Sequence, residues 1–207
     1  RGTTDLVVLG YGTHRWLGSR LLGSTGFFVL EEAPTSVLLV HTQPASLERC
    51  RVLVATDGSP EAQTAASVVT GLLDPGRCTI EVASASAMPS TWVAAVDSGL
   101  TAPYTGTLSR EAFDELLEGE RSKTEAIAQR TVGSLRAAGF QPDSQILFGP
   151  VKSTLLREVK EGHFDLVVVG SRGLGPIRRA LLGSVSEALV NHAPATLVGR
   201  ARPGPEE

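Results

Sequence analysis

Short apolar runs alternate with longer amphipathic stretches along most of the chain. Residues 51–56 form a mostly apolar run that ends at the turn sequence Asp-Gly-Ser-Pro. A run of this length before a turn cluster is typical of a buried strand. Ser59 is a favourable N-cap and Pro60 a favourable first helical residue, so a helix is predicted over residues 61–73.

The same alternation continues to the end of the chain and predicts an α/β fold. Continuous apolar strands separated by helices are typical of a parallel sheet that is covered on both faces. We therefore predict a doubly wound sheet of five parallel strands. The predicted strands cover residues 51–56, 78–85, 144–148, 165–169 and 195–200, and the predicted helices cover residues 61–73, 109–138, 153–161 and 178–192.

Part of this pattern occurs twice, at an offset of 160 residues. The sequence Asp-Leu-Val-Val-Leu-Gly at residues 5–10 recurs as Asp-Leu-Val-Val-Val-Gly at residues 165–170, and a Leu-Leu-Gly-Ser sequence and an Ala-Pro pair recur at the same offset. Such self-similarity indicates duplicated structural units. We expect three parts: a strand, helix and strand over residues 1–46, a complete unit over residues 49–202, and a tail over residues 203–207.

Charge and cysteine content narrow the classes of protein. The net charge of -3 and the pI of about 5.9 argue against a protein that coats nucleic acid. No apolar run approaches the roughly 20 residues that a membrane helix needs, and residues 1–10 lack the pattern of a signal peptide. Cys50 and Cys78 form no zinc pattern, and they are predicted to be reduced thiols in a cytoplasmic protein.

The turn that follows residues 165–169 carries the strongest chemical signal. It contains Gly170, Gly173 and Gly175, and a Gly-Ser pair follows at Gly183. Doubly wound sheets bind ligands beyond the carboxyl ends of their strands, where glycines and a helix N-terminus let backbone N–H groups approach a phosphate. The spacing matches neither a P-loop nor a dinucleotide fingerprint. Tight packing of the turn without any ligand is the alternative.

The motif Gly170-x2-Gly173-x9-Gly183-Ser resembles the nucleotide-binding signature of universal stress proteins. The Asp-Gly-Ser that follows residues 51–56 and the length of the complete unit fit the same family. The resemblance covers residues 49–202 completely and residues 1–46 as the last third of a second copy. The chain thus resembles a tandem member that lacks most of its first domain. The implied fold is Rossmann-like, of the adenine nucleotide alpha hydrolase type.

The resemblance also implies an ATP site, with or without Mg²⁺, since all signature glycines of the ATP-binding branch are present. Asp57 is expected on the adenine side, with Ala55 and Thr56 beside it. Ala85 is expected to offer its backbone to adenine, with Ser84 as the alternative. The turn at Gly149, after the third predicted strand, is a further candidate. The residues expected to hold ribose and phosphates are Gly170, Ser171, Arg172, Gly173, Gly183, Ser184, Val185 and Ser186.

The first copy departs from the signature, because Thr13 replaces its second glycine. We therefore expect no complete nucleotide site in residues 1–46, and association is their predicted role. In this family the last strand pairs across a dimer, so the resemblance implies a homodimer through residues 36–41 and 195–200. Unpaired edge strands of this kind need partners.

The expected function is an ATP-binding regulatory module for stress responses that acts through an unidentified protein partner. No catalytic or metal-binding residue is identified, so slow ATP hydrolysis is the most that is expected. Two alternatives stay open. One is a dimerisation scaffold of the same family that binds no nucleotide, and the other is an adenylating or ATP-hydrolysing enzyme.

Overall fold

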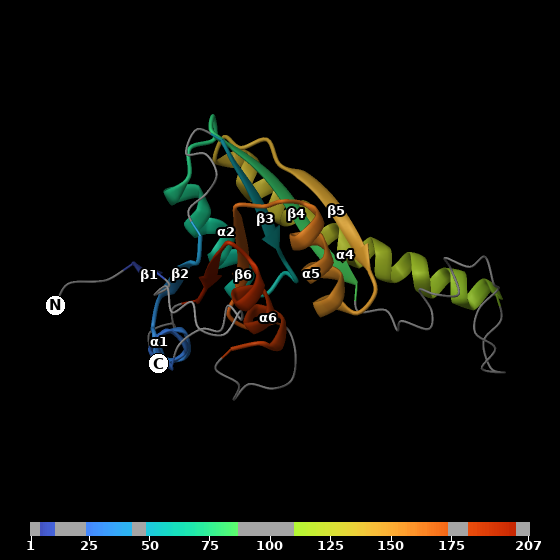
Figure 1. The fold of residues 1–207 in the computed structure, drawn as a ribbon. Helices are drawn as coiled ribbons and strands as arrows, with labels where there is room; N and C mark the ends of the chain where they lie inside the picture. Colours follow the sequence, from blue (N-terminus) through green and yellow to red (C-terminus); the bar gives the residue numbers. More distant parts are fainter. Residues whose placement is uncertain (1–4, 11–23, 43–48, 87–109, 174–181, 202–207) are drawn as a thin grey trace, which may run out of the picture.

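The computed structural model describes residues 5–10, 24–42, 49–86, 110–173 and 182–201. These residues form one seven-stranded sheet with helices on both faces (Figure 1). The strand order is β1-β2-β7-β6-β3-β4-β5, and neighbouring strands are parallel except for β2 and β7. The strands are β1 (Leu6–Gly10), β2 (Ser36–Val40), β3 (Cys50–Ala55), β4 (Cys78–Ser86), β5 (Asp143–Phe148), β6 (Leu166–Gly170) and β7 (Ala195–Gly199), and the helices are α1 (Ser24–Glu32), α2 (Pro60–Leu72), α4 (Arg110–Ala137), α5 (Val151–Glu161) and α6 (Ser184–His192).

The predicted α/β fold is confirmed, and the five strands from β3 to β7 are parallel to one another. The start of α2 follows from its first residues, because the Ser59 hydroxyl accepts a hydrogen bond from the N–H of Ala62 at 3.2 Å. The last helix begins at Ser184 rather than at residue 178, and residues 174–181 lie outside the described part of the chain.

Two apolar layers hold the helices to the sheet. On one face, α2 and α4 bury side chains such as Val69 and Leu135 against β3, β4 and β6. On the other face, α1, α5 and α6 bury side chains such as Leu30, Val159 and Leu189. Among the helices in the described ranges, none is both long enough and apolar enough to cross a membrane.

The N-terminal unit, which is the β1–α1–β2 segment, joins the sheet of the complete unit directly. Strand β2 pairs antiparallel with β7, with Leu38 opposite Leu197, and β1 lies outside β2. Both β2 and β7 therefore have a neighbouring strand on each side within the chain. The prediction of a homodimer through these two strands is wrong, because their hydrogen-bonding edges are already used.

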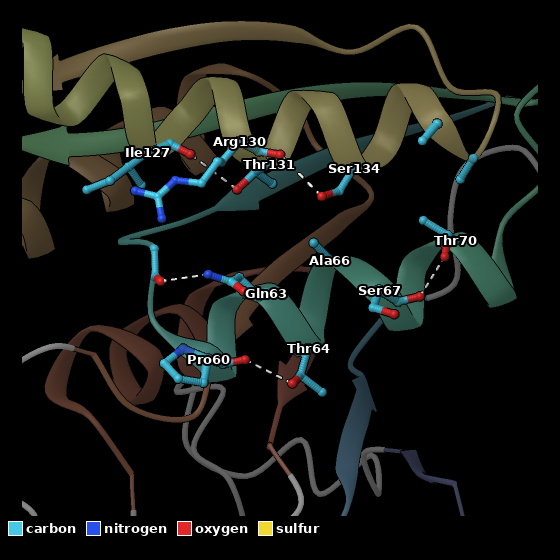
Figure 2. Close-up of a pocket in the computed structure, with 13 residues that line it drawn as sticks. Pro60, Gln63, Thr64, Ala66, Ser67, Thr70, Ile127, Arg130, Thr131 and Ser134 are labelled. Carbon is cyan, nitrogen blue, oxygen red and sulfur yellow. Dashed lines mark hydrogen bonds between the residues drawn. The ribbon is translucent and has the colours of Figure 1, made fainter.

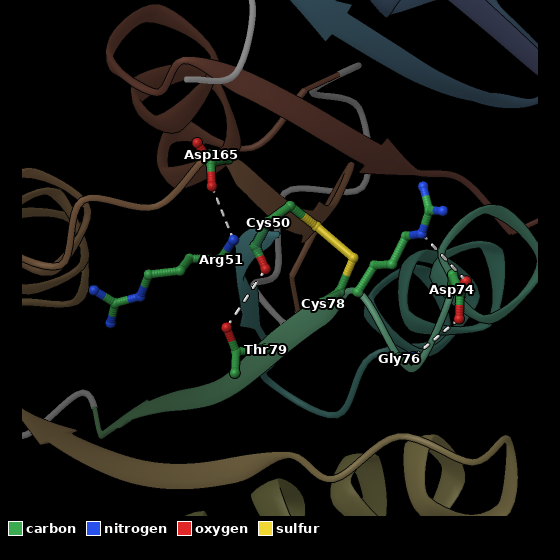
Figure 3. Close-up of a disulfide and its surroundings, with 8 residues drawn as sticks. Cys50, Arg51, Asp74, Gly76, Cys78, Thr79 and Asp165 are labelled. Atoms are coloured by element: carbon green, nitrogen blue, oxygen red, sulfur yellow. Dashed lines mark hydrogen bonds and ion pairs between the residues drawn. A yellow bond between two sulfur atoms is a disulfide. The ribbon is translucent and has the colours of Figure 1, made fainter. Parts of the chain in front are cut away.

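The prediction of two reduced thiols is also wrong, because Cys50 and Cys78 form a disulfide (Figure 3). Each cysteine is the first residue of its strand, and the two are register partners in the parallel β3–β4 pair, with Cα atoms 4.7 Å apart. That separation lies within the usual range for a disulfide. The bridge closes a loop that contains all of β3 and α2, at the opposite end of β3 from the glycine turns.

Candidate functional site at the carboxyl edge of the sheet

The turn after β3 is held in one conformation by its own side chains. The Asp57 carboxylate accepts a hydrogen bond from the N–H of Ser59 at 3.0 Å, and the Thr56 hydroxyl accepts one from the N–H of Gly58 at 3.2 Å. Gly58 has φ of 78°, a left-handed conformation that favours glycine. Ala55, the last residue of β3, is buried below this turn. The Asp57 side chain is half-buried at the edge of the sheet.

The turn after β6 lies directly against the turn after β3. The Ser59 hydroxyl donates a hydrogen bond to the carbonyl of Arg172 at 3.3 Å. A Cβ atom added to Gly173 would lie 2.6 Å from the Asp57 carboxylate oxygen Oδ2, so Gly173 leaves space for that side chain. The structure thus brings the predicted residue Asp57 together with Arg172 and Gly173, although more than 100 residues separate it from them in sequence.

The three signature glycines serve different purposes. A Cβ on Gly170 would lie 2.7 Å from the backbone nitrogen of Ala62, so close packing of α2 on β6 requires this glycine. A Cβ on Gly173 would meet only the end of a side chain. A Cβ on Gly183 would have its nearest neighbour, the carbonyl oxygen of Ser171, at 3.5 Å, which is ordinary contact. Packing within the protein therefore accounts for Gly170 but not for Gly183.

The N-terminus of α6 completes this edge. The N–H of Gly183 donates to the carbonyl of Ser171 at 2.8 Å, and this bond ties the helix start to the glycine turn. Ser184 is exposed and Val185 is half-buried. The buried Ser186 hydroxyl donates to the carbonyl of Gly170 at 2.6 Å, so its proton is used inside the protein. First-turn N–H groups of a helix lack intrahelical partners and favour anions.

The remaining predicted residues divide into two groups. Ala85 is half-buried near the end of β4, the strand beside β3, whereas the alternative residue Ser84 is fully buried. Gly149 follows β5, which lies two strands away from β3, and a Cβ there would meet the Thr154 hydroxyl of α5 at 3.0 Å. Because β5 pairs with β4, with Ala85 opposite Leu147, Gly149 lies next to the end of β4 and away from the glycine turn. Thr13 lies outside the described residues.

Two arginines lie near the glycine turn, and the sequence singled out only one of them. Arg172 is partly buried, and its Nε has no hydrogen-bond partner in the described part of the chain. Burial lowers the pKa of Arg200 below its ordinary value, the positive charge of Arg172 lowers it further, and the carboxylates of Glu32 and Glu61 oppose the shift. A signal for Arg200 existed, since it directly follows the strand next to the glycine turn.

A groove of about 830 Å³ between α2 and α4 was not predicted (Figure 2). It starts beside the turn after β3 and runs along the two helices. Thr64, Ser67 and Thr70 follow one another at every third position of α2, which places small side chains on one helix face. Such spacing is a signal for a groove, but the hydroxyls of Thr64 and Thr70 donate to backbone carbonyls of their own helix.

Metal-binding side chains do not gather in the described part of the chain. Within it, no group of three or more His, Cys, Asp or Glu side chains is placed to hold a metal ion. The described part of this edge offers backbone N–H groups and guanidinium groups to an anion, with the Asp57 carboxylate beside the glycine turn.

A model of the universal stress protein family matches residues 49–198. This chain belongs to the universal stress protein family. It is 30% identical over 160 residues to a putative universal stress protein of Staphylococcus haemolyticus, covering 75% of this chain and 87% of that protein. It is 29% identical over 194 residues to a universal stress protein of Mycobacterium tuberculosis, covering 91% of this chain but only 58% of that protein.

Solved structures share the fold at lower sequence identity. Universal stress protein UspA from Lactobacillus plantarum superposes with a TM-score of 0.59 at 21% identity, covering 75% of this chain and all of that protein. A universal stress protein in complex with cAMP has a TM-score of 0.50 at 21% identity, covering 74% of this chain and 98% of that one. These likenesses confirm the Rossmann-like architecture.

Proposed function

We propose that this chain binds an adenine nucleotide at the carboxyl edge of β3, β4 and β6 and acts as a regulatory module in stress responses. The observation that carries the proposal is the meeting of three separate segments: the turn after β3, the turn after β6 and the first turn of α6. Together they present a helix N-terminus, a guanidinium group and the two glycines Gly173 and Gly183. A Cβ atom at either glycine would not clash with the protein backbone.

The ligand is assigned by the chemistry of this edge. Asp57, with Ala55 and Thr56, is assigned to the adenine side together with Ala85. The glycine turn and the N-terminus of α6 are assigned to ribose and phosphates, because they offer N–H donors and positive charge to an anion. We propose ATP, with or without Mg²⁺, and any magnesium would be carried by its phosphates. The cAMP complex of a structural relative supports an adenine nucleotide as the ligand class.

For residues 1–46 we propose the terminal part of a second universal stress domain, without a nucleotide site of its own. The sequence repeat and the greater length of the M. tuberculosis relative support this assignment. We further propose that a protein partner recognises the nucleotide-bound form of the chain. The described residues of the site offer an anion-binding edge rather than a set of groups arranged for catalysis.

The test is binding of labelled ATP in equilibrium dialysis to the wild type and to two variants. Gly173→Val places a branched side chain against Asp57 and is expected to abolish binding while the circular dichroism spectrum is kept. Gly10→Val is the matched control, because a Cβ there has no neighbour within 4 Å, and it is expected to bind like the wild type. Unchanged affinity in folded Gly173→Val would show that the site is misplaced.

Two further measurements separate the alternatives. A wild-type protein that binds no ATP, and carries no nucleotide when its denatured extract is examined by mass spectrometry, would be a scaffold of the same family. Release of pyrophosphate in the presence of a carboxylic acid substrate would instead indicate an adenylating enzyme. We expect bound nucleotide and no pyrophosphate.

A further inference from the structure

The assigned nucleotide site runs across neighbouring strands. At the carboxyl edge of the sheet the order is β4, β3, β6 and β7, so Ala85, Asp57 and the glycine turn lie in sequence along one line. Strands are about 4.8 Å apart, and the three steps from β4 to β7 cover about 14 Å. A nucleotide whose base lies at β4 and β3 and whose first phosphate lies at β6 therefore extends its further phosphates toward β7.

Arg200 is the residue that occupies the end of this line. Gly199, at the end of β7, is the register partner of Gly170, and the N–H of Ser171 donates to the carbonyl of Gly199 at 2.7 Å. The backbone of Arg200 is thus fixed beside the glycine turn, on the side away from Asp57. Arg200 and Arg172 each directly follow this hydrogen-bonded junction between the two strands.

The N-terminal unit holds Arg200 in place. Its guanidinium Nη2 donates to the carbonyl of Leu30 at 2.7 Å, and its backbone N–H donates to the Ser36 hydroxyl at 3.3 Å. Leu30 belongs to the last turn of α1, where the carbonyls carry partial negative charge and attract cations. Because β2 is antiparallel to β7, the end of α1 and the start of β2 lie at the same edge of the sheet as the glycine turn.

We propose that Arg200 is a specificity-determining residue that binds the terminal phosphates of a nucleoside di- or triphosphate together with Arg172, and that the N-terminal unit positions it for this role. The inference rests on the proposed nucleotide site and adds to it the preference for several phosphates. Arg172 and Arg200 are both partly buried, and the positive charge of Arg172 acts unfavourably on that of Arg200. An anion bound by both side chains would offset this repulsion. The Nε of Arg172, buried without a hydrogen-bond partner in the described residues, is a donor suited to such an anion.

The experiment compares the affinities for AMP, ADP and ATP by isothermal titration calorimetry. The proteins are the wild type, Arg200→Gln, Arg200→Lys and Arg136→Gln, the last being a control with the same charge change at an exposed position on α4. The measured quantity is the ratio of ATP affinity to AMP affinity within each protein. If the role of Arg200 were purely structural, its variants would change folding stability and would weaken the binding of ATP and AMP by the same factor, so that the ratio would stay unchanged.

We expect the ratio in Arg200→Gln to fall roughly tenfold to a hundredfold, the range for one lost hydrogen-bonded charge contact. Arg200→Lys keeps the charge and is expected to retain part of the preference, which provides a measurement if Arg200→Gln does not fold. Arg136→Gln should match the wild type. If the wild type binds ATP and both Arg200 variants keep its ratio, the role of Arg200 is overturned and the proposed function stands. If the wild type binds no adenine nucleotide, both proposals fail.

Discussion

The two strand–helix–strand repeats, β1–α1–β2 and β6–α6–β7, share sequence and local structure but have different surroundings. Val168 in β6 is 0% exposed under the helices of the complete unit, whereas Val8, the residue at the same position of the repeat in β1, is 59% exposed. Gly170 lies against the backbone of α2, and its counterpart Gly10 has no neighbour within 4 Å. The repeated sequence thus specifies the strand–helix–strand fold. The elements that pack against each repeat determine whether it can form part of the proposed nucleotide site.

The neighbouring elements come from residues that have no counterpart in the N-terminal unit. The Asp57 turn, helix α2 and the disulfide all belong to the segment from β3 to β4. This segment packs on β6 and supplies the carboxylate that Gly173 faces. The proposed nucleotide site therefore depends on the repeat and this segment together. Variants that disturb one of these two regions but not the other test this difference.

The largest expected effect comes from the disulfide, a restraint that only the complete unit has. Closing a loop with a sequence separation of 28 residues is expected to contribute about 3–4 kcal/mol to the free energy of unfolding, chiefly by restricting the unfolded chain. Urea unfolding followed by circular dichroism, with and without a phosphine reductant, measures this difference. The double variant Cys50→Ser/Cys78→Ser should be as unstable as the reduced protein and insensitive to reductant. Two titratable thiols in denatured protein that was never reduced would contradict the prediction.

A smaller effect is expected at the paired glycines of the two repeats. Gly170→Ala forces a Cβ to within 2.7 Å of the Ala62 nitrogen and 3.0 Å of the Glu61 carbonyl carbon, so α2 must shift. We expect a loss of about 2–3 kcal/mol in unfolding free energy, the usual cost of overpacking. Gly10→Ala should be neutral or stabilising by up to about 1 kcal/mol, because alanine restricts the unfolded chain at an open position. If both variants lose the same free energy of unfolding, the close approach of α2 to Gly170 is not the cause of the loss.

The sequence predicted those parts of the fold that depend on local pattern. The start of α2 followed from Ser59 and Pro60, whose capping chemistry acts within a single turn. That the turns after the parallel strands lie at one edge of the sheet followed from the rule that ligand sites lie at the carboxyl ends of such strands. This inference needs only periodicity and strand direction, whereas the grouping of Asp57 with the glycine turn came from the resemblance to the family.

What the sequence did not predict depends on register and on partner choice. Cys50 and Cys78 were both near the starts of predicted strands, but their pairing required that those strands be neighbours in a fixed register. The antiparallel β2–β7 pair was missed for the same reason, because an apolar edge strand does not specify which edge it joins. The different roles of Gly170 and Gly183 depend on how closely α2 approaches, which no local pattern contains.

The smallest expected effect compares the same valine in the two repeats. Val168→Ala removes two buried methyl groups from the centre of the sheet, where the side chain packs in the same layer as Val54 and Leu197. The lost burial and the resulting cavity are expected to cost about 2 kcal/mol of unfolding free energy. Val8→Ala is the matched control, and since more than half of that side chain is exposed, its cost should stay below about 0.5 kcal/mol.

The outcome for Val8 decides more than a difference in stability. If Val8→Ala lowers the free energy of unfolding in urea as much as Val168→Ala does, the face of β1 that carries Val8 is covered in solution. The N-terminal unit is then packed more fully than the exposure of Val8 indicates. If only Val168→Ala is costly, the uncovered face of β1 marks the limit of the cooperative core. The N-terminal unit would then contribute to the complete unit through the β2–β7 pair, the apolar layer that the two units share around Leu30 and the contacts that hold Arg200, rather than through a core of its own.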